Sequence, residues 1–342
     1  MSLVSRRFGK FLVLFMLTGL FLLAGIIALP AQGQTFKDLA QSEAGLEEVQ
    51  APAITHNTWS SGAPLPTAAT QAASAVLKGQ IYVVGGYNST VLADTQIYNP
   101  VTNAWSTGSP LPVATDGGVA AVVHNVLYFI GGQTNTQTAT NAVYAYNPKS
   151  KAWTTMASMP TARFLTAAVV EKNIIYVIGG AVDNNDFVNT VESYNPATDI
   201  WTEESPMLGS KLGPAAGLLG TTIVAADGAT GPGAITGDME AYDASTNSWS
   251  ELVADPTARM SPCSGSIGSK FYAAGGYLNN AGAASTLTES YQLTKNKWAT
   301  LAAMPQGSMF AAPAVYKGKL YCFGGWATWV GAAINNVQTY QP

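Results

Sequence analysis

The feature of the sequence that most limits its possible folds is a short apolar segment that recurs six times at a nearly constant interval. Five copies end in a glycine pair: IYVVGG (81–86), LYFIGG (127–132), IYVIGG (175–180), FYAAGG (271–276) and LYCFGG (320–325). A degenerate sixth copy, IVAADG, occupies residues 223–228. The closing glycines of successive copies are 46 to 49 residues apart. A fixed period in this range indicates an architecture built from repeats.

Each repeat carries the same aromatic residues after its glycine pair. A tyrosine follows 12 to 15 residues later, as Tyr98, Tyr146, Tyr194, Tyr242, Tyr291 and Tyr340. In five repeats a tryptophan comes seven residues after the tyrosine, as Trp105, Trp153, Trp201, Trp249 and Trp298. Turn-forming pairs such as Asn99-Pro100 separate the two aromatics. Short runs rich in Ile, Val and Tyr that end at glycine are typical of buried antiparallel strands, and a feature that recurs in every repeat is expected to serve packing.

This combination of glycine pair, tyrosine and tryptophan resembles the kelch repeat, over residues 58–342. The resemblance implies that each repeat forms one four-stranded blade, so the expected fold is an all-β, six-bladed kelch-type β-propeller. The last repeat has Tyr340, but the chain stops at Pro342, before the expected tryptophan. Trp59 is a spare tryptophan ahead of the first repeat. We therefore predict that an N-terminal strand at Trp59 closes the last blade, which leaves no open sheet edge.

The N-terminal segment is predicted to take the chain out of the cytoplasm. Residues 1–33 combine Arg6, Arg7 and Lys10 with 19 uncharged residues and small residues near a cleavage position. This is the layout of a signal peptide, although the apolar run is long enough to serve instead as an uncleaved membrane anchor. A twin-arginine signal is a weaker alternative, because Phe8 directly follows the arginine pair. Residues 34–57 are expected to be a linker, so the propeller would be secreted or otherwise extracytoplasmic.

Composition excludes several kinds of protein. Only 11% of the residues are charged and 47% are hydrophobic, which argues against a disordered chain. Beyond residue 33 there are 13 basic and 20 acidic residues, so nucleic acid is not an expected partner. The two histidines, His56 and His124, offer no metal-ligand spacing, and no cofactor is expected. Cys263 and Cys322 lie in different repeats and strands; a disulfide is possible, but small buried thiols are preferred.

The expected site lies at the mouth of the ring, where kelch-like propellers gather the residues before each innermost strand and the loops after each glycine pair. The position 17 residues before each second glycine holds, in repeat order, Ala69, Thr115, Arg163, Lys211, Arg259 and Ser308. Three adjacent blades thus carry a cation at equivalent positions, which predicts a basic arc. Tyr87, Tyr277 and Trp326 follow glycine pairs and are expected to flank this arc. The alternative is that each cation pairs with a neighbouring carboxylate and is structural.

These residues predict a binding protein rather than an enzyme. Arginine binds planar anions, and Tyr, Trp and Arg are common interface residues, so the expected ligand is an anionic small molecule, a glycan or a protein segment. A monomer is expected, with membrane contact only through the N-terminal segment. The alternative function comes from the resemblance to extracytoplasmic sialic acid mutarotases, which are six-bladed kelch proteins. For such sugar epimerisation only Asp116 and Asp227 lie at suitable register positions for acid–base chemistry.

Overall fold

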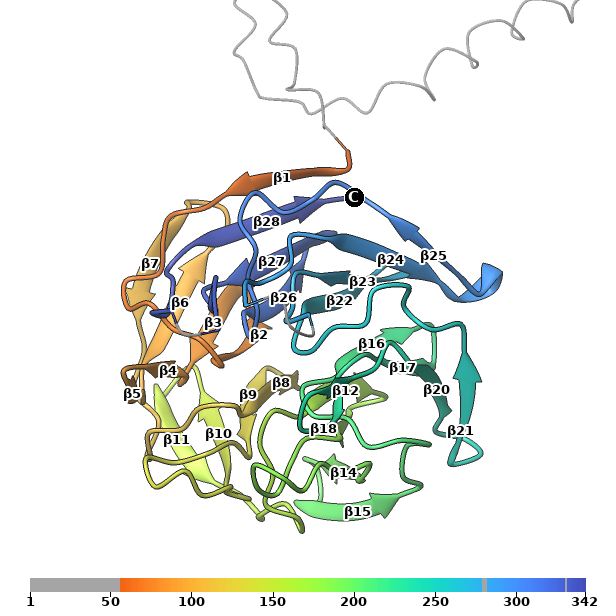
Figure 1. Cartoon of the computed structure of the whole chain (residues 1–342). Helices are drawn as coiled ribbons and strands as arrows, with labels where there is room; N and C mark the ends of the chain where they lie inside the picture. The colour runs from red at the N-terminus through yellow and green to blue at the C-terminus, as the bar shows by residue number, and fades with distance from the viewer. Residues whose placement is uncertain (1–55, 279–281, 330) are drawn as a thin grey trace, which may run out of the picture. The chain divides into compact units, whose positions relative to one another are not determined.

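The described part of the molecule is a ring of six four-stranded antiparallel sheets (Figure 1). It was obtained as a computed structural model that describes residues 56–278, 282–329 and 331–342. Within these ranges there is no α-helix, and one short 3-10 helix spans Leu293–Lys295. The prediction of an all-β, six-bladed propeller is therefore confirmed.

The four strands of each sheet follow one another from the centre of the ring to its outside. The innermost strands are β2 (Ala73–Leu77), β8 (Val119–Val123), β12 (Ala167–Glu171), β16 (Ala215–Leu219), β22 (Cys263–Ile267) and β26 (Ala312–Tyr316). The second strands, which carry the repeated apolar segment, are β3 (Gln80–Val84), β9 (Val126–Ile130), β13 (Ile174–Ile178), β17 (Thr222–Ala226), β23 (Lys270–Ala274) and β27 (Lys319–Phe323).

The third and fourth strands complete each blade. The third strands carry the tyrosines and are β6 (Thr95–Asn99), β10 (Val143–Asn147), β14 (Val191–Asn195), β20 (Met239–Asp243), β24 (Thr288–Gln292) and β28 (Val337–Gln341). The fourth strands carry the tryptophans and are β7 (Ala104–Thr107), β11 (Ala152–Thr155), β15 (Ile200–Glu204), β21 (Ser248–Leu252), β25 (Lys297–Thr300) and β1 (Thr58–Ser61). Two small hairpins lie in loops after glycine positions: β4 (Tyr87–Asn88) with β5 (Thr90–Val91), and β18 (Ala229–Gly231) with β19 (Ala234–Ile235).

The last blade is assembled from both ends of the described chain. Strand β1 pairs antiparallel with β28, with Trp59 opposite Tyr340, and completes the sheet β1-β28-β27-β26 (Figure 1). The predicted closure by an N-terminal strand is confirmed. The outer edge of β28 therefore pairs with β1, so the third strand of this blade does not expose unpaired backbone groups.

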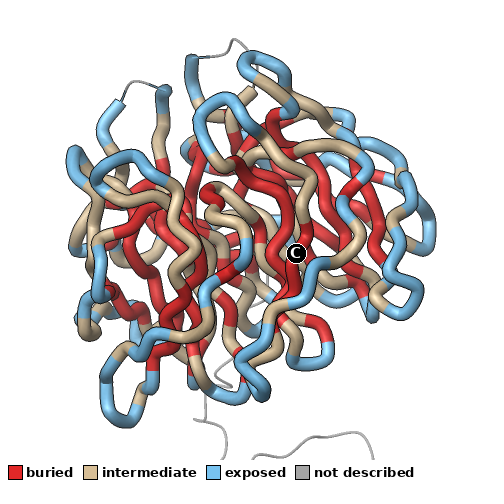
Figure 2. Tube along the Cα trace, turned by 90° about the horizontal axis from the view of Figure 1, so that it is seen from below, coloured by how far each residue is buried: buried red, intermediate tan, exposed pale blue. Residues whose placement is uncertain are grey.

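The hydrophobic core lies between neighbouring blades rather than in one central mass. Second strands are buried almost throughout, and their side chains pack mainly against the second and third strands of the neighbouring blade. Buried backbone follows the strands, and exposed backbone follows the turns at both ends of the blades (Figure 2). The innermost strands surround a central channel of about 610 Å³, lined largely by Ala, Gly, Val and Ser.

The repeated tyrosines and tryptophans form the outer packing layer. All six tyrosines are buried, at 3% exposure or less. Among the repeated tryptophans only Trp298 is buried, and the others are half-buried. The tryptophans instead bridge blades, because each indole N–H donates to a backbone carbonyl of the preceding blade: Ala302, Ala63, Ser109, Ala157, Ser205 and Val253.

The two cysteines form a disulfide, so the preference for free buried thiols was wrong. Cys263 of β22 is bonded to Cys322 of β27, with 5.8 Å between their Cα atoms. Their burial was predicted correctly, since both are at most 1% exposed. The two residues belong to adjacent blades, and the innermost strand of one blade packs face to face with the second strand of the next. Strand register within a blade carries no information about this contact, which explains the error.

The predicted targeting segment, residues 1–33, and nearly all of the predicted linker lie outside the described residues. Among the residues that are described, no helix is long and apolar enough to cross a membrane. The extracytoplasmic location stays a prediction.

Candidate functional site

The three predicted cations occupy equivalent positions of three adjacent blades, but they are buried inside those blades. Arg163 and Arg259 have no exposed surface, and Lys211 is 1% exposed. Arg163 pairs with Glu192 at 2.8 Å, and Lys211 pairs with Glu240 at 3.3 Å. The predicted ligand-binding basic arc is therefore corrected to a set of structural ion pairs.

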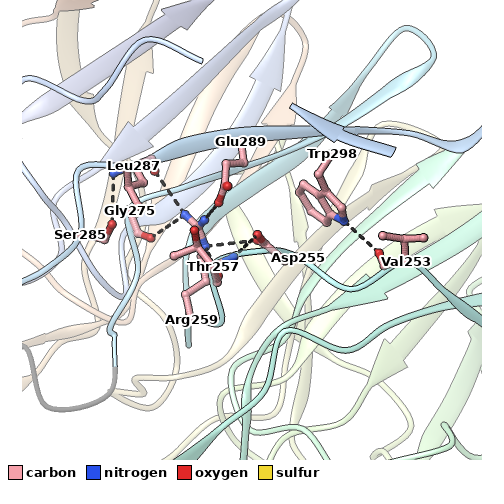
Figure 3. A network of polar contacts seen from close by, with 9 residues as sticks. All are labelled: Val253, Asp255, Thr257, Arg259, Gly275, Ser285, Leu287, Glu289 and Trp298. Atoms are coloured by element: carbon pink, nitrogen blue, oxygen red, sulfur yellow. Dashed lines mark hydrogen bonds and ion pairs between the residues drawn. The ribbon is translucent and has the colours of Figure 1, made fainter. Parts of the chain in front are cut away.

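Arg259 illustrates how these cations are bonded to groups inside their own blade (Figure 3). Its guanidinium contacts two carboxylates, Glu289 on the third strand and Asp255 in its own loop. The guanidinium also donates to the carbonyl oxygens of Thr257, Gly275 and Leu287. Arg163 likewise donates to the carbonyls of Gly179 and Thr190. Burial lowers the pKa of Arg163, and Glu192 opposes that shift. Because each of these cations is buried and already paired with a carboxylate, none is available to an anion at the mouth.

A sequence signal for these pairs exists but was missed. Each cation is followed 29 or 30 residues later by a glutamate, giving Arg163 with Glu192, Lys211 with Glu240, and Arg259 with Glu289. In the other three blades neither position is charged. The third-strand position holds Gln338, Gln96 or Tyr144, and the position of the cation holds Ser308, Ala69 or Thr115 in the same order. The cation and the acid therefore occur together or not at all. Such co-occurrence indicates a buried pair, since either charge alone would be costly to bury.

The predicted aromatic residues do gather at the mouth. Trp326 lies next to Tyr87, with ring centroids 6.4 Å apart, and Tyr277 packs on Trp329 at 4.6 Å. Phe310 joins the two groups, at 5.7 Å from Trp326 and 6.0 Å from Trp329. Trp329 and Phe310 were not among the predicted site residues, and Phe310 was missed because its equivalents in the other repeats are not aromatic. We call these five residues the aromatic wall.

A cavity of about 490 Å³ lies beside this wall and is the candidate site. Tyr277, Trp326, Trp329 and Phe310 line one side, while Tyr87 reaches it only through its contact with Trp326. The other side comes from loops of blades 3 and 4, including Phe187, Pro232 and Ile235. Among the described lining residues, the amides Gln71, Gln133 and Asn184 add polar groups to the Tyr277 hydroxyl and the two indole N–H groups. None of the described residues that line the cavity carries a charge.

The two acid–base candidates are not part of this cavity. Asp116 is 7% exposed, and burial raises its pKa to about 7. Asp227 is fully buried beside Asp255; burial first, and Asp255 second, raise the pKa of Asp227 well above its ordinary value. Neither carboxyl lines the mouth cavity. Within the described residues, no group of three or more potential ligands could hold a metal ion.

Comparison with known proteins agrees with the repeat pattern and the geometry. A family model described as the KLHDC2/KLHL20/DRC7 Kelch-repeats domain matches residues 107–276, and the Kelch motif model matches residues 68–112. The solved structure of YjhT is similar to this chain with a TM-score of 0.71, covering 80% of this chain and 95% of that one. At 18% identity this likeness shows a shared fold and no more. A search of curated proteins finds no match.

Proposed function

Since this chain belongs to the kelch-repeat family, whose propeller fold supports a binding role, we propose that it binds its ligand in the cavity at the channel mouth. The observation that carries the proposal is the aromatic wall beside an otherwise apolar cavity. Binding pockets are mostly apolar and aromatic, with a few polar groups that orient the ligand. The described lining of this cavity has that composition, with three amides among its polar groups.

The bound group is uncharged and has an apolar face. Burying a charge without a partner is strongly unfavourable, and the part of the cavity lining that the structure describes offers no charged partner. The anionic ligand inferred from the basic arc is therefore not retained, because the cations are bonded inside the blades. An uncharged group that stacks on Tyr277 and Trp326 and reaches the amide of Gln71 fits the lining. Sugar epimerisation receives no support from the cavity, because neither Asp116 nor Asp227 lines it.

Calorimetric titration of the full chain tests this proposal. The probes are hexyl β-glucoside, which is uncharged with an apolar tail, and N-acetylneuraminic acid, which carries a carboxylate. We expect the glucoside to bind with an affinity that changes little between low and high salt, because screening acts on charges. Tyr277→Ala should weaken glucoside binding at least tenfold. Tyr316→Ala is the matched control, since Tyr316 is also a half-buried tyrosine but does not line the cavity.

Two results would overturn the proposal. One is glucoside binding that is equally strong in wild type and in Tyr277→Ala. The other is salt-sensitive binding of N-acetylneuraminic acid with a higher affinity than that of the glucoside, which would indicate an anionic ligand.

We also propose that the protein works outside the cytoplasm. The Cys263–Cys322 disulfide supports this, because disulfides persist mainly in oxidising compartments. The basic and apolar character of residues 1–33 supports it independently. Mass spectrometry of native protein, alkylated before any reduction, should find neither thiol modified. Alkylation of both cysteines in freshly isolated material would contradict the proposal.

A further inference from the structure

A closed ring of backbone hydrogen bonds surrounds the central channel just below the mouth. It is formed by the residues that lie 15 positions before each second glycine: Gln71, Gly117, Leu165, Gly213, Ser261 and Phe310. The N–H of each residue donates to the carbonyl oxygen of its counterpart in the preceding blade, and Gln71 donates to Phe310. The six N···O distances lie between 2.7 and 3.0 Å. Every blade therefore contributes one bond to the same closed ring.

All six ring residues have left-handed backbone conformations. Their φ values lie between 48° and 61°. Glycine adopts this conformation without a steric penalty, whereas residues with a Cβ are disfavoured in it. Gly117 and Gly213 show that the ring bond itself needs no side chain. The side chains of Leu165 and Phe310 thus occupy positions where the backbone favours glycine. A strained residue of this kind suggests a functional reason for its retention.

The three large side chains of the ring lie between two cavities. All six ring residues line the central channel of about 610 Å³. Only Gln71, Leu165 and Phe310 also line the mouth cavity of about 490 Å³. The small residues at the other three positions do not reach it. The large side chains come from blades 1, 3 and 6, and they are the ones that separate the two cavities.

We propose that Gln71, Leu165 and Phe310 form the floor of the mouth cavity and set the length of the apolar group that it accepts. This inference rests on the proposed function, because the floor matters only if the cavity binds a ligand. Phe310 has a second role, since its ring also contacts Trp326 and Trp329 of the aromatic wall. A short apolar group ends on this floor, whereas a longer one would have to displace Phe310 or Leu165 to enter the channel.

A chain-length series of ligands tests the floor. The probes are n-alkyl β-glucosides from butyl to decyl, titrated below their micelle concentrations against the full chain. Each methylene that becomes buried should strengthen binding about fourfold. In the wild type this gain should stop at the length where the chain meets the floor. In Phe310→Gly the gain should continue for at least two further methylenes, because the channel beyond becomes accessible.

Lys317→Gly is the matched control for the glycine substitution. Lys317 is exposed and left-handed, with φ 47°, and it follows the same strand, β26, that Phe310 precedes. It should leave both affinity and length limit unchanged. Leu165→Gly provides a second opening of the floor that is usable if Phe310→Gly does not fold. Loss of Phe310 also removes a contact with the wall, so the diagnostic readout is the length limit and not the affinity at one length.

The outcomes separate the two proposals. An identical length limit in wild type, Phe310→Gly and Leu165→Gly would overturn the floor while leaving the mouth cavity as the site, provided that Tyr277→Ala still weakens binding. Binding that is insensitive to Tyr277→Ala would instead overturn the site, and the floor with it. A longer limit in either floor variant, but not in Lys317→Gly, supports the inference.

Discussion

The outer layer of the propeller repeats from blade to blade, whereas the mouth does not. In five blades the tyrosine hydroxyl bonds an Asn or Asp in a left-handed turn, and that side chain also accepts a backbone N–H of the neighbouring blade: Asn57, Asn103, Asp199, Asn247 and Asn296. Equivalent mouth positions instead carry Tyr87, Gln133, Ala181, Ala229, Tyr277 and Trp326. Repetition therefore identifies packing, and its loss marks the surface that is free to recognise a ligand.

The buried cations refine this comparison. Arg163, Lys211 and Arg259 recur in three of six blades, an intermediate degree of repetition, and their role is structural. A residue that recurs in some of the blades, together with a partner that recurs in the same blades, therefore has a structural role like that of the outer-layer residues. Predictions about the two regions should then separate cleanly: changes in the outer layer alter stability, and changes at the mouth alter binding.

The largest effect is expected from removing strand β1. Deletion of residues 1–61 exposes the edge of β28 and removes the Trp59 bond to Ala302 and the Asn57 bond to Tyr340. We expect the loss of a large part of the roughly 5–15 kcal/mol that stabilises a typical domain, together with aggregation through the open edge. Thermal unfolding and size-exclusion chromatography measure both. Deletion of residues 1–50 is the control, and equal behaviour of the two truncations would show that closure does not depend on β1.

A single truncation in the outer layer should come next. Tyr194 is fully buried, stacks on Trp201 and donates its hydroxyl to Asp199. Tyr194→Ala should lower the free energy of unfolding by about 3–5 kcal/mol, the usual cost of deleting a buried aromatic ring. Tyr194→Phe should cost only about 1 kcal/mol, because it removes one hydrogen bond and keeps the ring. Urea denaturation measures both, and similar losses in the two variants would mean that ring packing is not the dominant contribution.

Asp116 should make stability depend on pH. Its pKa is about 7 in the folded protein and 3.8 as an ordinary aspartate, because burial disfavours the charged form. The folded state thus holds the proton more tightly than the unfolded state. The stabilisation that comes from this bound proton is complete below about pH 4 and is lost as the pH rises to about 7. At pH 8, Asp116→Asn should be more stable than wild type by roughly 2–4 kcal/mol.

The same comparison at pH 4 should show a difference of less than about 1 kcal/mol, since Asp116 is then protonated in the folded state and about half protonated in the unfolded state. Chemical denaturation at the two pH values measures this. Asp186→Asn, at an exposed aspartate, is the control and should change stability little at either pH. A stabilisation by Asp116→Asn that is the same at pH 4 and pH 8 would refute the titration argument.

The smallest effect on stability is expected at the mouth. Trp329 is 45% exposed, although it packs on Tyr277 at 4.6 Å. Trp329→Ala should lower the free energy of unfolding by roughly 1–2 kcal/mol, less than Tyr194→Ala, because nearly half of the Trp329 surface stays in water. The same variant should weaken binding of hexyl β-glucoside. Strong destabilisation, comparable with that of Tyr194→Ala, would show that Trp329 serves packing, as the outer layer does. It would contradict the proposed difference between the outer layer and the mouth.

The sequence alone was enough to predict the six blades, the closure at Trp59 and the packing role of the tyrosines. These features depend on antiparallel pairing and on turns between neighbouring strands, so they repeat at fixed spacing and can be read from it. It also placed Tyr277 and Trp326 beside one cavity, because equivalent positions meet at one face of the ring.

Only the tertiary structure decided where side chains point and what they meet across blades. It turned Arg163, Lys211 and Arg259 inward onto carboxylates and joined Cys263 to Cys322. It also brought Phe310 into the wall and into the ring below the mouth. Register defines a residue's blade, strand and height but not the direction of a long side chain. That direction depends on desolvation and on partners supplied by distant parts of the chain, which no single repeat contains.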